Sequence, residues 1–244
     1  MKYLKRTLAL LALLATGLTT NGQTVDTAAQ IVDHYVELLG NDRWPADSLL
    51  VMTTVITSPG STDTFVMKRW FMPPQMQRVE VRLGKTLQTG FCSNGKDIFR
   101  MYRYRWRQWR DTSSLAYYEN FIGYDFRGPL YNWRAQGAEL TYKGLSSVLG
   151  HNEMKSVKVV VPRQYARYYF FEPSGLMSVV VETDEISEEP PHKVPHTEWK
   201  FIHEYLPVGN SLLPSKESFM RDGKLTVMET TAHFEPADHT IFSK

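Results

Sequence analysis

The sequence predicts a mainly β protein with some α-helix, and three features of its 244 residues support this. Runs rich in Val, Thr, Ile and aromatic residues follow one another from residue 47 onward. Turns containing Gly, Pro or Asn separate most of these runs at short spacing. Before them, one segment has the apolar period of a helix. Because short loops cannot make parallel crossovers, we expect one long, largely antiparallel sheet.

The first residues are typical of a secretory signal peptide. Three basic residues within the first six precede an apolar run at 8–18, which is too short for a permanent membrane anchor. Small residues near position 22 favour cleavage before Gln23. We therefore expect a signal peptide at 1–22, a single exported domain at 23–244, and a location in the periplasm.

The charge balance of the exported domain is close to zero. The chain has 28 basic and 26 acidic residues, and removal of the three basic residues of the signal peptide leaves 25 basic residues (28 − 3). This near-neutral balance argues against nucleic acid as a partner. Cys92 is the only cysteine and lies far from the cleavage region, so we expect neither a lipid anchor nor an internal disulfide.

The segment after the signal peptide predicts an amphipathic helix. Thr27 and Gln30 have the spacing of a capping box, and Gly40 supplies a C-terminal stop. Apolar residues recur between them with helical period: Ile31, Val32, Tyr35, Leu38 and Leu39.

Twelve further segments have strand character. Residues 77–83 alternate most clearly, with Val79 and Val81 on one side and Arg78 and Glu80 on the other. The expected strands are 47–58, 62–71, 77–83, 86–92, 97–109, 139–143, 155–161, 166–171, 176–183, 197–205, 211–220 and 224–234.

Two interruptions separate groups of strands. Residues 113–136 have mixed helical spacing broken by glycine and proline, which predicts two short helices. Residues 182–196 are acidic and contain prolines, which predicts a mobile loop. An unclosed barrel with helices across its mouth and a sheet curled around one helix would both cover the apolar face of so long a sheet.

Several motifs occur in an order that resembles a known family. They are AAQIVDHYVELLG near the start, Lys68-Arg69 ahead of Pro73-Pro74, MQRVEV from Met76, the turn Ser93-Asn94-Gly95-Lys96, FRGPLYNWRAQG, and LPSKESFMRDGKL with the terminal Phe242. Together they span residues 28–242. The chain resembles the outer-membrane lipoprotein-sorting carriers of the LolA/LolB-like superfamily, in the version typical of Bacteroidetes.

The resemblance implies an unclosed antiparallel β-barrel, a strongly curved sheet with the N-terminal helix and short helices covering its concave face. It also implies binding of lipid or lipoprotein acyl chains without bond chemistry and without a cofactor. In the family a basic pair directly precedes a proline, and its arginine helps hold the lid closed. Here residues 70–72 separate Arg69 from Pro73.

Apolar and aromatic residues are the candidates for an acyl-chain site, because burial contributes about 0.8 kcal/mol per methylene. We expect six of them in the concave wall: Phe65, Met67, Val79, Val81, Trp199 and Phe201. Three others are candidates for the lid: Leu38, Phe121 and Trp133.

The run FRMYRYRWRQWR at 99–110 interleaves five arginines with aromatic residues. We expect a sheet strand with its aromatics inward, its arginines outward and a one-residue bulge near 101–103. Arg103, Arg105 and Arg107 would then form an outward row that meets anionic lipid headgroups or an acidic partner surface, because arginine forks suit phosphate and carboxylate.

No motif for catalysis or metal binding is expected to form. His192, His196 and His203 lie near glutamates, but prolines interrupt the spacing that a helical metal site would need. Cys92 has no adjacent base, which favours a buried structural cysteine.

Two alternatives to a carrier remain open on the same fold. One is a periplasmic sensor or scaffold in the manner of the sigma-factor regulator RseB, which would act through a membrane-associated protein partner. The other is a secreted hydrolase, which would need carboxylates or histidine on the concave face. The polarity of that face discriminates among these readings.

Overall fold

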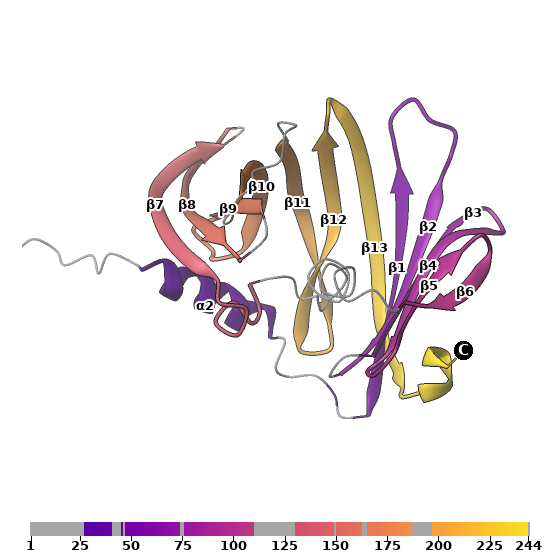
Figure 1. Ribbon diagram of the computed structural model, residues 1–244. Helices are drawn as coiled ribbons and strands as arrows, with labels where there is room; N and C mark the ends of the chain where they lie inside the picture. The colour runs from indigo at the N-terminus through magenta and orange to yellow at the C-terminus, as the bar shows by residue number, and fades with distance from the viewer. Residues whose placement is uncertain are drawn as a thin grey trace, which may run out of the picture.

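Among the residues that it describes, the computed structural model has one sheet of 13 strands that is not closed into a barrel and one α-helix (Figure 1). It describes residues 27–40, 45, 47–73, 76–109, 130–148, 150–162, 165–186 and 197–243. The expected signal peptide, the first of the two expected short helices, Phe121, His192 and His196 therefore lie outside the described residues.

The helix α2, Ala28–Leu39, begins and ends where the sequence predicts. The Thr27 hydroxyl accepts a hydrogen bond from the Gln30 N–H at 3.2 Å, and the Gln30 side chain accepts one from the Thr27 N–H at 2.7 Å. Gly40 ends the helix with a left-handed φ of 63°. The capping box and the glycine stop are confirmed.

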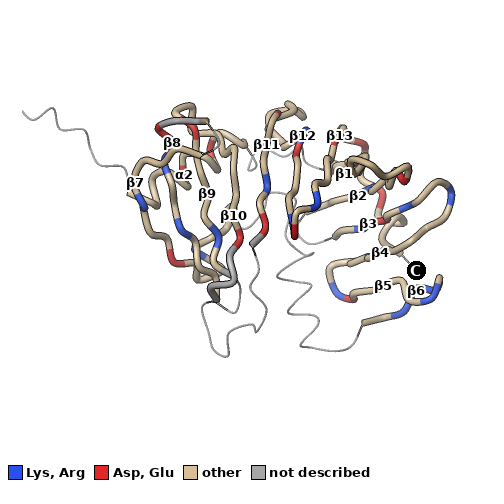
Figure 2. Tube along the Cα trace, turned by 90° about the horizontal axis from the view of Figure 1, so that it is seen from above, with Lys and Arg blue, Asp and Glu red and all other residues tan. Residues whose placement is uncertain are grey.

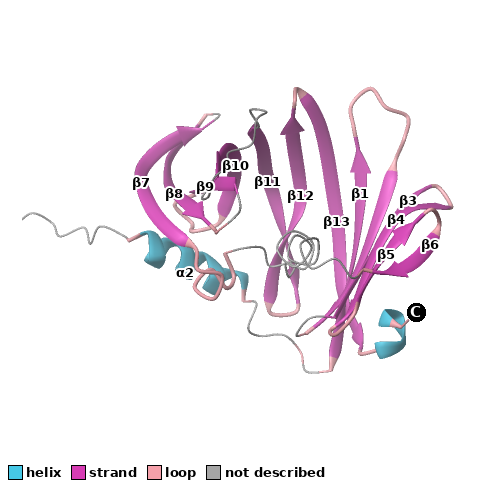
Figure 3. Cartoon of the chain, viewed as in Figure 1, coloured by secondary structure: helices cyan, strands magenta, loops and turns pink. Residues whose placement is uncertain are grey.

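Short turns connect most of the strands, as expected from the turn residues (Figure 3). The strands are β1 Ser48–Thr57, β2 Phe65–Met72, β3 Met76–Leu83, β4 Thr86–Asn94, β5 Ile98–Tyr102, β6 Arg105–Gln108, β7 Glu139–Val148, β8 His151–Val160, β9 Tyr165–Phe171, β10 Met177–Ile186, β11 Thr197–Val208, β12 Ser211–Arg221 and β13 Lys224–Pro236. A 3₁₀ turn, η1, follows at His239–Phe242.

Two expectations about the interruptions need correction. Residues 130–137, at the end of the second expected short helix, form consecutive turns before β7. Strand β10 continues to Ile186, so the start of the expected acidic loop belongs to the sheet. The rest of that loop, 187–196, lies outside the described residues.

The strand order is β6-β5-β4-β3-β2-β1-β13-β12-β11-β10-β9-β8-β7, and every neighbouring pair is antiparallel. The pairing of β1 with β13 joins two meanders, which we call the β1–β6 half and the β7–β13 half. Strands β6 and β7 are the two edges. The sheet curves between these edges, as seen from above in Figure 2.

The two faces of the sheet are covered by different elements. Helix α2 packs through Val32 and Tyr35 on one face of the β7–β13 half, where the Tyr35 and Phe171 rings meet edge to face at 5.5 Å. We call this the inner face. The C-terminal turn packs Phe242 against Val51 and Cys92 on the opposite face, the outer face.

Candidate functional site

A strip of apolar side chains lies on the inner face of the β1–β6 half. Met67 pairs with Val81, and the adjacent rungs place Phe65 and Val79 on the same side. All four side chains are only partly buried. The contacts of α2 with the sheet lie over the other half, on β7 and β12. Four of the expected wall residues therefore share a partly exposed stretch of the inner face.

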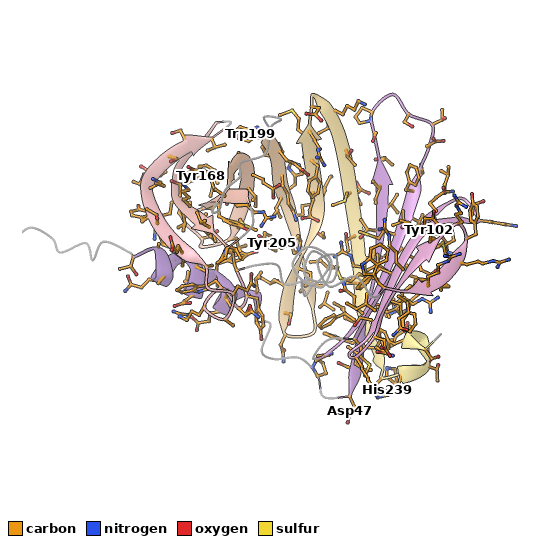
Figure 4. The ribbon with its side chains drawn as sticks, viewed as in Figure 1. Asp47, Tyr102, Tyr168, Trp199, Tyr205 and His239 are labelled. Carbon is orange, nitrogen blue, oxygen red and sulfur yellow. The ribbon has the colours of Figure 1, made fainter. Side chains whose placement is uncertain are left out.

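The expected placement of Trp199 and Phe201 in this wall is wrong. Trp199, labelled in Figure 4, pairs with Val181 and belongs to an outer-face cluster. Its ring stacks on that of Phe201, with the ring centroids 6.1 Å apart. The inner face of β11 carries Lys200 and Ile202 instead. Strand alternation separates two sets of side chains, but it does not tell which set faces the helix.

The two described lid candidates lie at the helix-covered end of the sheet. A methyl of Leu38 sits against the turn at Gly175, between β9 and β10. Trp133 packs against the core under α2, and its indole N–H donates a hydrogen bond to Asp33 at 3.2 Å. Phe121, the third candidate, is outside the described residues.

Charged side chains also lie on the inner face, between the apolar strip and the core under α2. Lys200 and the buried Glu217 form an ion pair between β11 and β12. Arg69 lies on the same face, and burial lowers the pKa of its guanidinium while the charge of Glu217 opposes that shift. The inner face is therefore not entirely apolar, and the sequence analysis missed this group. Alternation along β2 and β12 could have placed Arg69 and Glu217 beside the apolar residues.

The other carboxylates that the register places on the inner face are also paired with cations. Arg167 contacts Glu182 at 2.7 Å, and Arg221 lies 3.8 Å from Glu198. Near Glu217, the hydroxyl of the partly buried Tyr205 donates to the Met177 carbonyl at 2.7 Å (Figure 4). Burial raises the pKa of Tyr205 well above its usual range, so its phenol stays protonated.

The arginine-rich run forms a hairpin rather than one bulged strand. Strands β5 and β6 pair with each other, and Arg103 and Tyr104 make the two-residue turn between them. Both turn residues have left-handed backbones, with φ of 47° and 64°, as a tight hairpin with the sheet's twist needs. The predicted bulge is wrong because the chain reverses at this point.

The orientation predicted for this run is also wrong. Phe99 pairs with Cys92 and Trp106 packs against the same outer-face cluster, so these aromatic residues face outward. Arg107 pairs with Arg100, which pairs with Phe91 on the inner face. Figure 2 colours the basic residues of β5 and β6 blue. The aromatic residues face the outer side because η1 covers that side with apolar contacts.

His203 and Cys92 make hydrogen bonds that belong to the packing of the sheet. A ring nitrogen of His203 lies 2.8 Å from the Ser218 hydroxyl. The buried Cys92 thiol donates to the Phe242 carbonyl at 3.6 Å. Within the described ranges, no three His, Cys, Asp or Glu side chains gather as a metal ion would need.

Comparison with solved structures finds a similar fold in bacterial proteins. A LolA superfamily protein from Nitrosomonas europaea has a TM-score of 0.59 at 10% identity, over 90% of this chain and 99% of that one. The chain has the fold of the LolA superfamily. No family model matches the sequence, and no curated protein matches it either.

Two further solved structures have a similar fold. A DUF1329 family protein from Desulfovibrio piger has a TM-score of 0.56 at 12% identity, over 90% of this chain and 100% of that one. A protein domain from Vibrio parahaemolyticus, described as outer membrane lipoprotein-sorting, has a TM-score of 0.53 at 9% identity, over 87% of this chain and 97% of that one. No helix among the described residues is long and apolar enough to span a membrane.

Proposed function

We propose that this protein is an exported, non-enzymatic carrier or binding protein that holds lipid or lipoprotein acyl chains on the inner face of its sheet. The observation that carries the proposal is the strip formed by Phe65, Met67, Val79 and Val81, whose apolar side chains are only partly buried. A contiguous stretch of exposed apolar surface marks a binding site, because its contact with water is unfavourable unless a ligand or partner covers it.

The LolA-like fold supports the same assignment. A neighbour with this fold is described as an outer membrane lipoprotein-sorting protein domain. The signal peptide expected at 1–22 would bring the chain to the compartment where such proteins work. An acyl chain that lies on the strip would remove its methylenes from water at about 0.8 kcal/mol each.

The charged groups on the inner face support binding rather than catalysis. The described carboxylates there, Glu182, Glu198 and Glu217, are each held by a cation. Carboxylates that are engaged in ion pairs between strands hold the sheet together, whereas a general acid or base must lie within hydrogen-bond reach of a substrate.

Displacement of a fluorescent fatty acid tests the proposal. Phe65→Asp places a charge in the strip and should weaken binding at least about tenfold, because the carboxylate must be desolvated by the bound chain. Val66→Asp is the matched control, since Val66 is also partly buried on β2 but pairs with Arg82 on the outer face. Equal affinity of the two variants, or no binding by the wild type, would reject the proposal.

A further inference from the structure

The six strands of the β1–β6 half contain a single carboxylate, and it lies on the outer face. This residue is Glu80, which binds Arg78 at 2.6 Å and Arg82 at 2.9 Å. The inner face of the same strands carries Arg69, Arg100, Arg105 and Arg107 among apolar and neutral residues. The inner face of these strands therefore has a positive field that no carboxylate of the same strands offsets.

Arg69 and two of these arginines lie on one rung of the sheet. The rung runs through Met52, Arg69, Val79, Phe91, Arg100 and Arg107 on strands β1 to β6. Arg100 and Arg107 are directly opposite each other, an arrangement in which like charges destabilise a sheet. Neighbouring strands are about 4.8 Å apart, so Arg69 and Arg107 are roughly 19 Å apart if measured along a flat sheet. One small headgroup cannot contact both, and Arg69 is the one inside the apolar strip.

The Arg69 guanidinium has weak hydrogen-bond acceptors for a partly buried cation. Among the described residues, its hydrogen bond is to the Met67 sulfur at 3.8 Å, and a thioether is a weak acceptor. The carboxylate that attracts it, Glu217, already forms an ion pair with Lys200. A partly buried cation with unused donors is costly unless an anion reaches it.

We propose that Arg69 binds the anionic headgroup, a carboxylate or a phosphate, of the amphiphile that lies on the inner face. The inference rests on the proposed function and names its ligand class. The guanidinium fork matches either anion with two parallel hydrogen bonds. The chain of the amphiphile would lie over Met67 and Val81, on the neighbouring rung. Arg105 and Arg107 at the sheet edge add attraction for an approaching anion.

Three probes with the same palmitoyl chain test this inference: palmitate, palmitoyl lysophosphatidic acid and monopalmitin, which is neutral. Each probe competes with a fluorescent fatty acid for binding to the purified exported protein. The wild type should bind at least one anionic probe about tenfold more tightly than monopalmitin, as two charge-assisted hydrogen bonds would give. The ratio of palmitate to lysophosphatidic acid affinity identifies the anion.

Variants of adjacent residues on β2 separate the headgroup contact from a general charge effect. Arg69→Gln should remove the preference for anionic probes and leave the affinity for monopalmitin unchanged. Lys68→Gln removes the same charge, but from an exposed side chain that pairs with Glu80 on the outer face, so it should keep the preference. Arg69→Lys should retain part of the preference, because it keeps the charge and loses the fork. Circular dichroism checks that each variant is folded.

The outcomes distinguish this inference from the proposed function. Equal binding of anionic and neutral probes by the wild type would overturn the headgroup contact with Arg69, but it would still agree with an acyl-chain site. A loss of preference in Lys68→Gln as large as in Arg69→Gln would also overturn it. If none of the three probes binds, both the proposed function and the headgroup contact with Arg69 are rejected.

Discussion

Asp33 accepts hydrogen bonds from both terminal nitrogens of the Arg134 guanidinium, at 2.8 and 2.6 Å. Asp33 is on α2, and Arg134 lies in the turns before the edge strand β7. The two parallel bonds therefore join the helix to the segment that leads into the end of the sheet. Trp133 adds a third hydrogen bond to the same carboxylate at 3.2 Å.

The contact between Asp33 and Arg134 predicts a small, pH-dependent contribution to stability. The hydrogen bonds from Arg134 lower the pKa of Asp33, so its contribution is complete above the unfolded value of about 3.9 and is lost as pH falls through the folded value. Asp33→Asn should lower the free energy of unfolding by less than about 1 kcal/mol at neutral pH, because the pair is exposed.

Urea unfolding at neutral and at acidic pH measures this effect. The difference between wild type and Asp33→Asn should shrink toward zero below the folded pKa of Asp33. Glu37→Gln is the control, since it removes an exposed carboxylate of the same helix. A difference between wild type and Asp33→Asn that stays constant with pH would contradict the prediction.

Gly40 should tolerate no side chain. Its φ is 63°, and a Cβ there would lie 2.2 Å from the Asn210 carbonyl oxygen. Gly60 also has a left-handed φ, of 81°, but a Cβ at that position has nothing within 4 Å. Gly60→Ala should therefore cost about 1 kcal/mol from backbone strain alone, and Gly40→Ala clearly more. Thermal unfolding of the two variants compares the costs, and equal shifts in melting temperature would refute the close approach.

Phe242 should be required for stability although it is near the end of the chain. Its side chain is fully buried against Leu49, Val51 and Cys92 on the outer face. Phe242→Ala should lower the free energy of unfolding by about 3–5 kcal/mol, as loss of a buried phenyl ring does elsewhere. Denaturant unfolding measures the loss, with His239→Ala in the same turn as the control, since His239 is exposed. A cost below about 1 kcal/mol would mean that η1 does not cover this face.

Glu80 should stabilise the outer face of β3 through its two arginines. Burial raises the pKa of its carboxyl, but hydrogen bonds from Arg82 and Arg78 outweigh burial and leave the pKa lowered. Glu80→Gln should cost about 1.5–3 kcal/mol at neutral pH, because it weakens charge-assisted hydrogen bonds in a buried place. The cost should fall as pH drops through the folded pKa, where the wild-type carboxyl is neutral as well. Urea unfolding across this pH range tests it.

Much of the fold is readable from local signals. Thr27, Gln30 and Gly40 specify the helix ends through groups only a few residues apart. Alternation in β3 separates Val79 and Val81 from Arg78 and Glu80, and short turns require antiparallel neighbours. The sequence could not reveal the reversal at Arg103 and Tyr104, because residues of these types adopt left-handed φ only when the surrounding structure requires it.

Outside the 97–109 run, the sequence by itself determined the capped helix, the approximate position of the strands, their antiparallel pairing and the composition of each strand face, because these depend on residues close together in the chain. Only the tertiary structure decided which face of each strand is the inner one. Trp199 and Phe201 lie on the outer face and Arg107 on the inner face, contrary to expectation. Side-chain alternation has a period of two and is the same for either choice, so the choice depends on where distant elements such as α2 and η1 pack.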